Sequence, residues 1–198
     1  PGNVTQKAKQ RGVKVYALTD EGYRIPNKSK VLSVFGSNGN YALSGNKLII
    51  PANYTSQNGG VGFAFDAIDQ LDAADNTCGI FKVYLIVDGD TVYGQDMTEI
   101  SFETNRQINS HKDYEDYHLR RKHFQKTFKT PHNSMPIYRK LKNNGILKLA
   151  PGKSYRVQYI CEDVHGNSSK LNFDLVVEPG ISGDANDFYT TKGEYLYP

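Results

Sequence analysis

The stretch VGFAFDAIDQLDAADNTCGIFKVYLIVDG, at Val61–Gly89, decides the fold class, because it joins two strand patterns through an Asp-rich turn. Large apolar residues at every second position of Val61–Ala67 alternate with small ones, as in a strand with one face in a core. The run Ile80–Val87 predicts a central strand buried on most of both faces. The triplet Asp88–Asp90 predicts a tight hairpin turn.

The same scheme returns in YRVQYICEDVHGNSSKLNFDLVVEPG, at Tyr155–Gly180. Alternating apolar residues flank an Asp- and Gly-containing turn: Tyr155, Val157, Tyr159 and Cys161 before it, and Leu171, Phe173, Leu175 and Val177 after it. Long, non-local strands with such turns are typical of an antiparallel sandwich. We therefore expect a mainly β protein, an Ig-like antiparallel β-sandwich over 60–178 with a short helix-containing insertion at 99–142.

The flanking segments are assigned by their patterns. Short strand patterns within 11–59, separated by Gly- and Asn-rich turns, predict a small β meander on the N-terminal side, with a loop at Asp20–Lys30. Residues 1–10 are polar, and we expect a frayed N-terminus. Residues 179–198 form an acidic, tyrosine-rich tail without periodicity.

Composition excludes several classes of protein. The chain has 198 residues, 38% of them hydrophobic and 23% charged, which fits one globular domain and neither a disordered nor a membrane protein. No run approaches the roughly 18–20 apolar residues of a transmembrane helix. The first residues do not resemble a signal peptide, and we interpret Pro1–Asn3 as a trimmed start.

The insertion differs from the strands on either side of it. Its central part, Glu99–Tyr138, holds four of the five histidines and lacks strand alternation. Residues Arg106–Lys142 carry ten Lys/Arg against three Asp/Glu, although the whole chain has a net charge of only +3. About three turns of helix are predicted at Asp113–Lys122. For His118–Lys129 we favour an amphipathic strand over a nucleic-acid-binding segment, and therefore expect no nucleic acid partner.

Neither the histidines nor the Asp-rich turn has the pattern of a metal site. The spacings of His111, His118, His123 and His132 match neither the i,i+4 nor the i,i+2 pattern of zinc sites, so we favour solvated or hydrogen-bonded histidines. The turn that contains Asp69, Asp72 and Asp75 offers oxygen ligands for calcium but lacks an EF-hand order, and ordinary turn chemistry is the preferred interpretation. We expect no cofactor.

Neither the two cysteines nor any sequence motif indicates a reactive site. Cys78 and Cys161 are interpreted as small buried hydrophobes rather than as a disulfide, which would require an exported protein. Neither a G-x-S-x-G elbow nor a phosphate-binding glycine loop occurs. Enzymatic chemistry within this chain is not expected.

Six segments occur in an order that resembles a known family. They are RGVKVYAL (11–18), the stretch 61–89, SFETNRQINSHKDYEDY (101–117), PIY (136–138), NNGILKL (143–149) and EDVHGNSSKLNF (162–173). Together they resemble the region that follows the catalytic domain in lysostaphin-type zinc peptidoglycan endopeptidases of Gram-negative bacteria. The similarity covers 11–178, and it departs from the family pattern where TPHNSMPIY (130–138) replaces a Gly-containing turn.

The resemblance implies a role without catalysis. The family's zinc ligands lie in H-x-x-x-D and H-x-H motifs, and neither motif occurs in this chain. The resemblance implies a non-catalytic accessory domain in the cell envelope, in the periplasm. Its expected partners are a catalytic peptidase domain in cis or trans and peptidoglycan or another glycan. Arg120, Arg121 and His123, with neighbouring tyrosines, are the expected ligand-binding residues. The alternative is a free-standing glycan- or protein-binding module.

Overall fold

The computed structural model describes residues 7–55, 59–70 and 77–180, and its strands dominate the fold. The strands are β1 (Lys9–Thr19), β2 (Arg24–Ser37), β3 (Asn40–Ile50), β4 (Gly59–Gln70), β5 (Thr77–Cys78), β6 (Lys82–Val87), β7 (Asp90–Asp96), β8 (Phe124–Lys126), β9 (Tyr138–Leu141), β10 (Ser154–Glu162) and β11 (Ser168–Val177). The short helices are η1 (Ala52–Tyr54), η2 (Asn105–Gln107), α1 (Ile108–His111), α2 (Tyr114–Arg120) and η3 (Asn143–Gly145).

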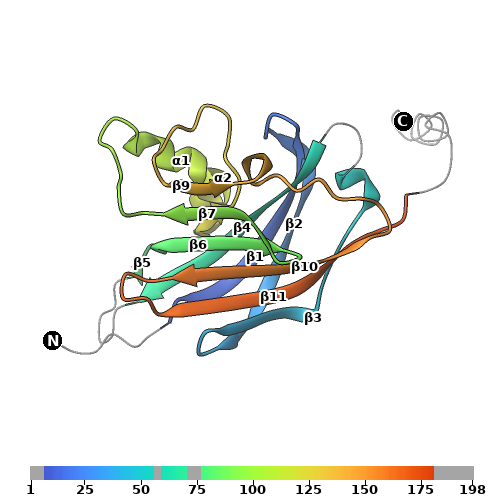
Figure 1. Cartoon of the computed structure of the whole chain (residues 1–198), viewed down its shortest axis with the longest axis horizontal. Coiled ribbons are helices and arrows are strands. Elements are labelled where there is room, and N and C mark those ends of the chain that lie inside the picture. Colours follow the sequence, from blue (N-terminus) through green and yellow to red (C-terminus); the bar gives the residue numbers. More distant parts are fainter. Residues whose placement is uncertain (1–6, 56–58, 71–76, 181–198) are drawn as a thin grey trace.

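All these strands belong to one sheet, which curls into a half-barrel (Figure 1). Its order is β5-β4-β1-β2-β3-β11-β10-β6-β7-β9, with β8 paired to β4. Among the described pairs only β3 and β11 run parallel, and this pair joins the N-terminal strands to the C-terminal ones. The prediction of a mainly β protein is confirmed. An Ig-like sandwich is not confirmed, because the sheet is continuous from one half to the other.

The predicted meander residues are part of this sheet. The expected loop Asp20–Lys30 is wrong beyond Tyr23, because β2 begins at Arg24, and Arg24 and Ser29–Ser33 pair with β1. The left-handed backbone of Asn27, next to Pro26, accommodates the local irregularity of the pairing. Backbone pairing with a long neighbour therefore outweighs the turn residues in the sequence.

The main core lies inside the curl, where β1 and β4 face β10 and β11. The alternating apolar residues of β4 and β11 are buried there, as their pattern predicts, and so are Val157, Tyr159 and Cys161 of β10, whereas Tyr155 at the start of β10 is only half-buried. The ring of Phe65 stacks on Tyr159 with centroids 3.7 Å apart, and Phe63 meets Phe173 edge-on at 5.9 Å. Strand β6 differs from its prediction, because only Val83, Leu85 and Val87 are buried and the alternate residues are half-exposed.

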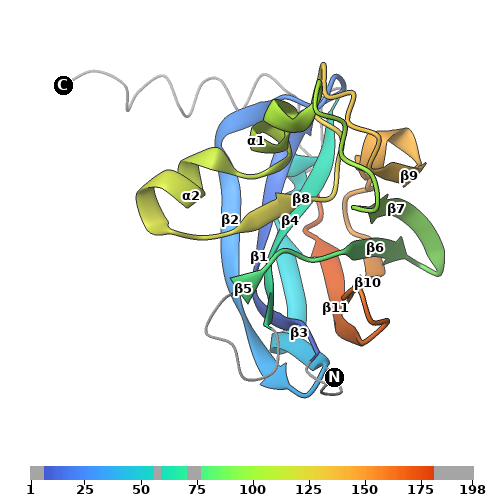
Figure 2. The ribbon, with the colours of Figure 1, turned by 90° about the vertical axis from the view of Figure 1, so that its left-hand side faces the viewer.

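The insertion covers the outer face of β1 and β4, away from β10 and β11 (Figure 2). Here Tyr16 and Leu18 of β1 pack with Phe124 and Phe128 in a second apolar cluster. The expectation that both phenylalanines point inward is confirmed, although the regular strand β8 covers only Phe124–Lys126, and His118–Arg120 of the predicted strand belong to α2.

A glycine makes this close packing possible. A Cβ atom at Gly62 would lie 2.5 Å from Leu18 Cδ1 and 2.6 Å from Phe128 Cδ1. The small residues that alternate along β4 therefore allow the insertion to approach the sheet backbone.

Candidate functional site: a cationic basin beside α2 and an apolar groove at the β6–β7 hairpin

A buried group of charges fixes the insertion on the sheet. Lys14 of β1 donates from Nζ to Asp113 Oδ2 at 2.8 Å and to Asp116 Oδ2 at 2.6 Å, and the hydroxyl of Tyr16 donates to Asp113 Oδ2 at 2.6 Å. Arg24 of β2 adds a weaker contact to Asp113 at 3.2 Å. We call Lys14, Tyr16, Asp113 and Asp116 the anchor cluster.

Local sequence explains why the two carboxylates meet one lysine. Asp113 caps the N-terminus of α2 and accepts the backbone N–H of Asp116, so both side chains lie in the first turn of the helix. Burial acts to raise the pKa of Asp113, but hydrogen bonds from Lys14 and Tyr16 outweigh it and lower the pKa to about 2. The carboxylate therefore stays ionised at neutral pH.

The three residues predicted to bind a ligand lie at the C-terminal end of α2. Arg120 is bonded to Asp116 while its side chain remains 65% exposed. Arg121 ends the helix in a left-handed conformation and is exposed. His123 is half-buried, with its ring edge-on to Tyr117 at 5.2 Å. With the exposed Tyr114 they make up what we call the α2 surface.

A basin of about 420 Å³ lies beside this surface, between α2 and β2. Its walls carry three cationic side chains, Lys14, Arg24 and Arg120, against one carboxylate, Glu115. Asp113 and Asp116 are buried behind it and formally offset the two excess positive charges of this lining. Of the three predicted residues, Arg120 alone contributes to the basin.

Sequence reasoning missed Lys14 and Arg24. One signal was present, because the alternation of β1 places Lys14 on the same side of the strand as Tyr16, between apolar residues. A lysine inside an apolar strand requires a buried partner or an exposed face. Its partner lies 99 residues further along at Asp113, a separation that no local pattern reveals.

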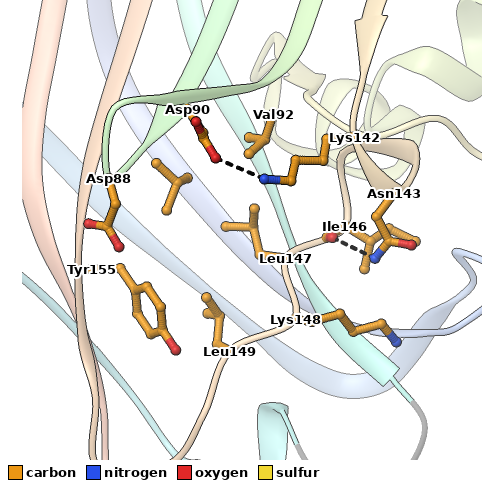
Figure 3. Close-up of a pocket in the computed structure, with 11 residues that line it drawn as sticks. Asp88, Asp90, Val92, Lys142, Asn143, Ile146, Leu147, Lys148, Leu149 and Tyr155 are labelled. Atoms are coloured by element: carbon orange, nitrogen blue, oxygen red, sulfur yellow. Dashed lines mark hydrogen bonds and ion pairs between the residues drawn. The ribbon is translucent and has the colours of Figure 1, made fainter.

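A second concave surface lies at the β6–β7 hairpin, and we call it the hairpin groove (Figure 3). It measures about 470 Å³. Its apolar lining consists of Val87, Val92, Ile146, Leu147, Leu149 and Tyr155. Lys142 reaches Asp90 at 2.8 Å along one edge. Asp88 and Lys148 complete the charged rim.

His111 is neither solvated nor hydrogen-bonded, contrary to the prediction for the histidines. It is fully buried, neither ring nitrogen forms a hydrogen bond with a described residue, and its ring lies edge-on to Tyr138 at 6.2 Å. Burial, and after it the nearby ammonium groups of Lys126 and Lys112, lower the pKa of His111 to about 3. His111 is therefore neutral at pH 7.

Cys161 is a free thiol inside the core. It contacts the Ser169 hydroxyl at 3.0 Å, and burial raises its pKa to about 12. The Cys78 side chain lies outside the described part of the structure, and so do Asp72 and Asp75 of the calcium hypothesis. Among the described residues no three His, Cys, Asp or Glu side chains are grouped to hold a metal ion.

Comparison of the chain with protein-family models, with curated proteins and with solved structures gave no match. None of the helices in the described ranges has both the length and the apolar character needed to cross a membrane.

Proposed function

We propose that this chain is a non-catalytic accessory β domain of a cell-envelope peptidoglycan metallopeptidase in the periplasm. Its role is to position the catalytic domain or to contact the cell wall. The ordered resemblance of 11–178 supports the family, and an Ig-like sandwich remains the proposed description of the fold. The observation that carries the binding role is the position of Arg120, which belongs to both the α2 surface and the basin.

The anchor cluster supports this proposal by holding the cations in place before a ligand arrives. Arg120 is bonded to Asp116, and Asp116 is bonded to the buried Lys14. Side chains fixed in this way lose less conformational entropy on binding. Peptidoglycan presents carboxylates on its stem peptides, which match guanidinium groups, and sugar rings, which match exposed tyrosines such as Tyr114 and Tyr117.

Sedimentation with purified peptidoglycan tests wall contact. The chain should be retained, and Arg120→Ala/Arg121→Ala should reduce retention severalfold. A matched control is Lys153→Ala/Lys170→Ala. It removes two exposed charges, one directly before β10 and one in β11, and should leave retention unchanged. Equal retention of the Arg double variant would remove the α2 surface from the proposal.

The natural reading frame separates the accessory domain from a free-standing module. A peptidase domain with H-x-x-x-D and H-x-H motifs upstream of Pro1 would support the first role, and its absence would favour the second. Incubation of the chain with peptidoglycan fragments, with and without added zinc, tests the remaining alternative. Release of a product would show that the chain is itself an enzyme.

A further inference from the structure

Strand β2 has an edge along which no other strand of the described part of the chain is paired. Its residues Ser29–Ser33 pair with β1 on one side, whereas on the other side pairing with β3 is confined to Val34–Ser37. Strand β3 has left-handed backbone at Gly45 and Asn46, where its pairing with β11 is also irregular, and an irregularity of this kind bends a strand. The two strands therefore diverge from their shared hairpin (Figure 1).

The β2–β3 hairpin fixes which backbone groups face this open edge. Its two-residue turn is closed by Ser37 and Asn40, which exchange hydrogen bonds as the closing pair of such a turn does. Because hydrogen-bonded and non-hydrogen-bonded positions alternate along a strand, the N–H and C=O groups of Ser29, Val31 and Ser33 point to the same side as those of Ser37. We call these three residues the β2 edge.

Apolar side chains lie beside the β2 edge on the outer face of the sheet. Val31 and Phe35 are 51% and 60% exposed, and Ile49 of the diverging strand β3 is 45% exposed. Leu32 and Val34 point to the opposite face, where they pack against the core. A strand added beside β2 would therefore place every second side chain next to exposed apolar groups.

Two lysines of β2 lie on the core-side face of the same strand. The ammonium of Lys28 contacts the carbonyl of Asn53 at 3.4 Å, and that of Lys30 contacts the carbonyl of Ile49 at 3.5 Å. Neither ammonium forms an ion pair with a described residue. Since whole lysine side chains cross from β2 to these carbonyls, the two segments lie farther apart than the roughly 4.8 Å of paired strands.

The sequence around these lysines has no acidic residue to balance them. Segment 22–65 contains four Lys/Arg and no Asp or Glu. Of the other two cations, Arg24 bonds to Asp113, and Lys47 is in register with Asp174 of β11. The unbalanced charge beside the β2 edge is therefore that of the two lysines of β2, and a carboxylate would replace their long contacts to neutral carbonyls by charge-assisted hydrogen bonds.

We propose that the β2 edge binds an extended acidic peptide by strand addition, with carboxylates and apolar side chains at alternate positions. The free N–H and C=O groups of the β2 edge match a peptide backbone. Lys28 and Lys30 match carboxylates on one face of the added strand, and Val31 matches apolar side chains on the other. From Ser29 to Ser33 the edge is about 13 Å long at the rise of a strand, which a segment of about five residues covers. This inference goes beyond the proposed wall contact and uses no residue of the α2 surface.

A titration followed by ¹H–¹⁵N NMR tests the proposal on the full chain. The probe is an N-acetylated, C-amidated hexapeptide that alternates valine with glutamate, and two control peptides carry glutamine or lysine in place of glutamate. The glutamate peptide should shift the amide signals of Ser29, Val31 and Ser33, the glutamine peptide should bind severalfold more weakly, and the lysine peptide should not bind. Shifts confined to α2, or equal binding of the three peptides, would overturn the proposal.

Backbone methylation of the probe distinguishes strand addition from simple attraction between charges. Of two isomers of the glutamate peptide, one N-methylated on the valines and one on the glutamates, one should bind at least roughly tenfold more weakly, because only one set of N–H groups faces the β2 edge. Both isomers carry the same charge. Equal binding of the two would show that no strand is added.

A charge variant tests the role of the two lysines. Lys28→Gln/Lys30→Gln should weaken binding of the glutamate peptide severalfold and leave binding of the glutamine peptide unchanged. The matched control is Lys140→Gln/Lys153→Gln, which removes two exposed charges outside β2 and β3 and should bind the glutamate peptide as the parent protein does. If both double variants bind the glutamate peptide equally well, the acidic occupant is wrong.

A proline variant tests the backbone of the edge itself. Val31→Pro removes an N–H that points away from β1, so the ladder between β1 and β2 should remain, whereas Val31→Ala keeps the N–H. Peptide binding should be lost in the first variant and retained in the second. Equal binding by both contradicts the proposal, and if the proline variant fails to fold, the methylated isomers decide the question.

Sedimentation velocity of the free chain tests the competing occupant, a second copy of this chain. The parent protein should remain monomeric at the concentrations of the titration. A dimer that the glutamate peptide dissociates and that Val31→Pro does not form would make the second copy the occupant, and would overturn the proposal.

Discussion

The ammonium of Lys14 lies 2.6 Å from a carboxylate oxygen of Asp116, a residue 102 positions further along the chain. The Lys14 side chain is only 6% exposed and the Asp116 side chain 2%. This pair, together with Asp113, connects the sheet to the insertion that carries the predicted ligand-binding residues.

Substitution Lys14→Met should destabilise the fold by about 3–5 kcal/mol, because it removes the buried cation that two buried carboxylates share and leaves them only the more exposed Arg24 and Arg120. Urea unfolding measures the change. Lys47→Met, in the exposed part of β3, is the matched control and should change stability by less than about 0.5 kcal/mol. A loss below about 1 kcal/mol for Lys14→Met would show that the anchor cluster is not needed for stability.

Substitution Gly62→Ala should cost about 1–3 kcal/mol, because the new methyl group would overlap Leu18 and Phe128. The comparison is Gly79→Ala, where a Cβ meets no atom within 4 Å. Thermal unfolding of both variants checks the difference. Equal melting temperatures would mean that the insertion moves away from β4 without cost.

Stability should fall as the pH drops below 6.5, because burial lowers the pKa of His111 to about 3 in the folded state. Because the pKa of His111 is lower in the folded state, the unfolded chain binds the proton first as the pH falls. The contribution of neutral His111 to the free energy of unfolding is therefore complete above pH 6.5 and is lost progressively between pH 6.5 and pH 3. By pH 5 the free energy of unfolding should have fallen by about 2 kcal/mol because of this group alone.

Chemical unfolding of His111→Phe at pH 7 and pH 5 measures that contribution. The variant should lose less stability between the two pH values than the parent protein, whereas His118→Phe, at an exposed site on α2, should behave as the parent does. An unchanged pH dependence in His111→Phe would place the titrating group elsewhere.

Retention on peptidoglycan should weaken as salt rises from about 50 to about 300 mM NaCl, because the cations of the α2 surface are exposed and their interactions are screened. Sedimentation at several salt concentrations measures this.

Local patterns predicted much of the fold. The period of two in β4, β10 and β11 identified their buried faces. Asp88 and Gly89 identified the hairpin turn, and the even spacing of Phe124 and Phe128 indicated that both are buried. Pairing across the chain was not predictable in this way. The parallel contact of β3 with β11 and the length of β2 depend on neighbours that lie far away in sequence.

The candidate sites were predicted only in part. Arg120 belongs to the basin and was identified from local charge, whereas Lys14 and Arg24 come from strands about a hundred residues earlier. The hairpin groove had no signal, because its apolar residues look like ordinary core residues. Which core residues lie at an open edge is decided by how the sheet curls.

Strand β11 lies between β3 and β10 in the sheet. During translation both neighbours emerge from the ribosome before it, and each keeps an unpaired edge until residues 168–177 arrive. Expression clones that stop short of Val177 should therefore aggregate, and recombinant boundaries have to be drawn beyond that strand.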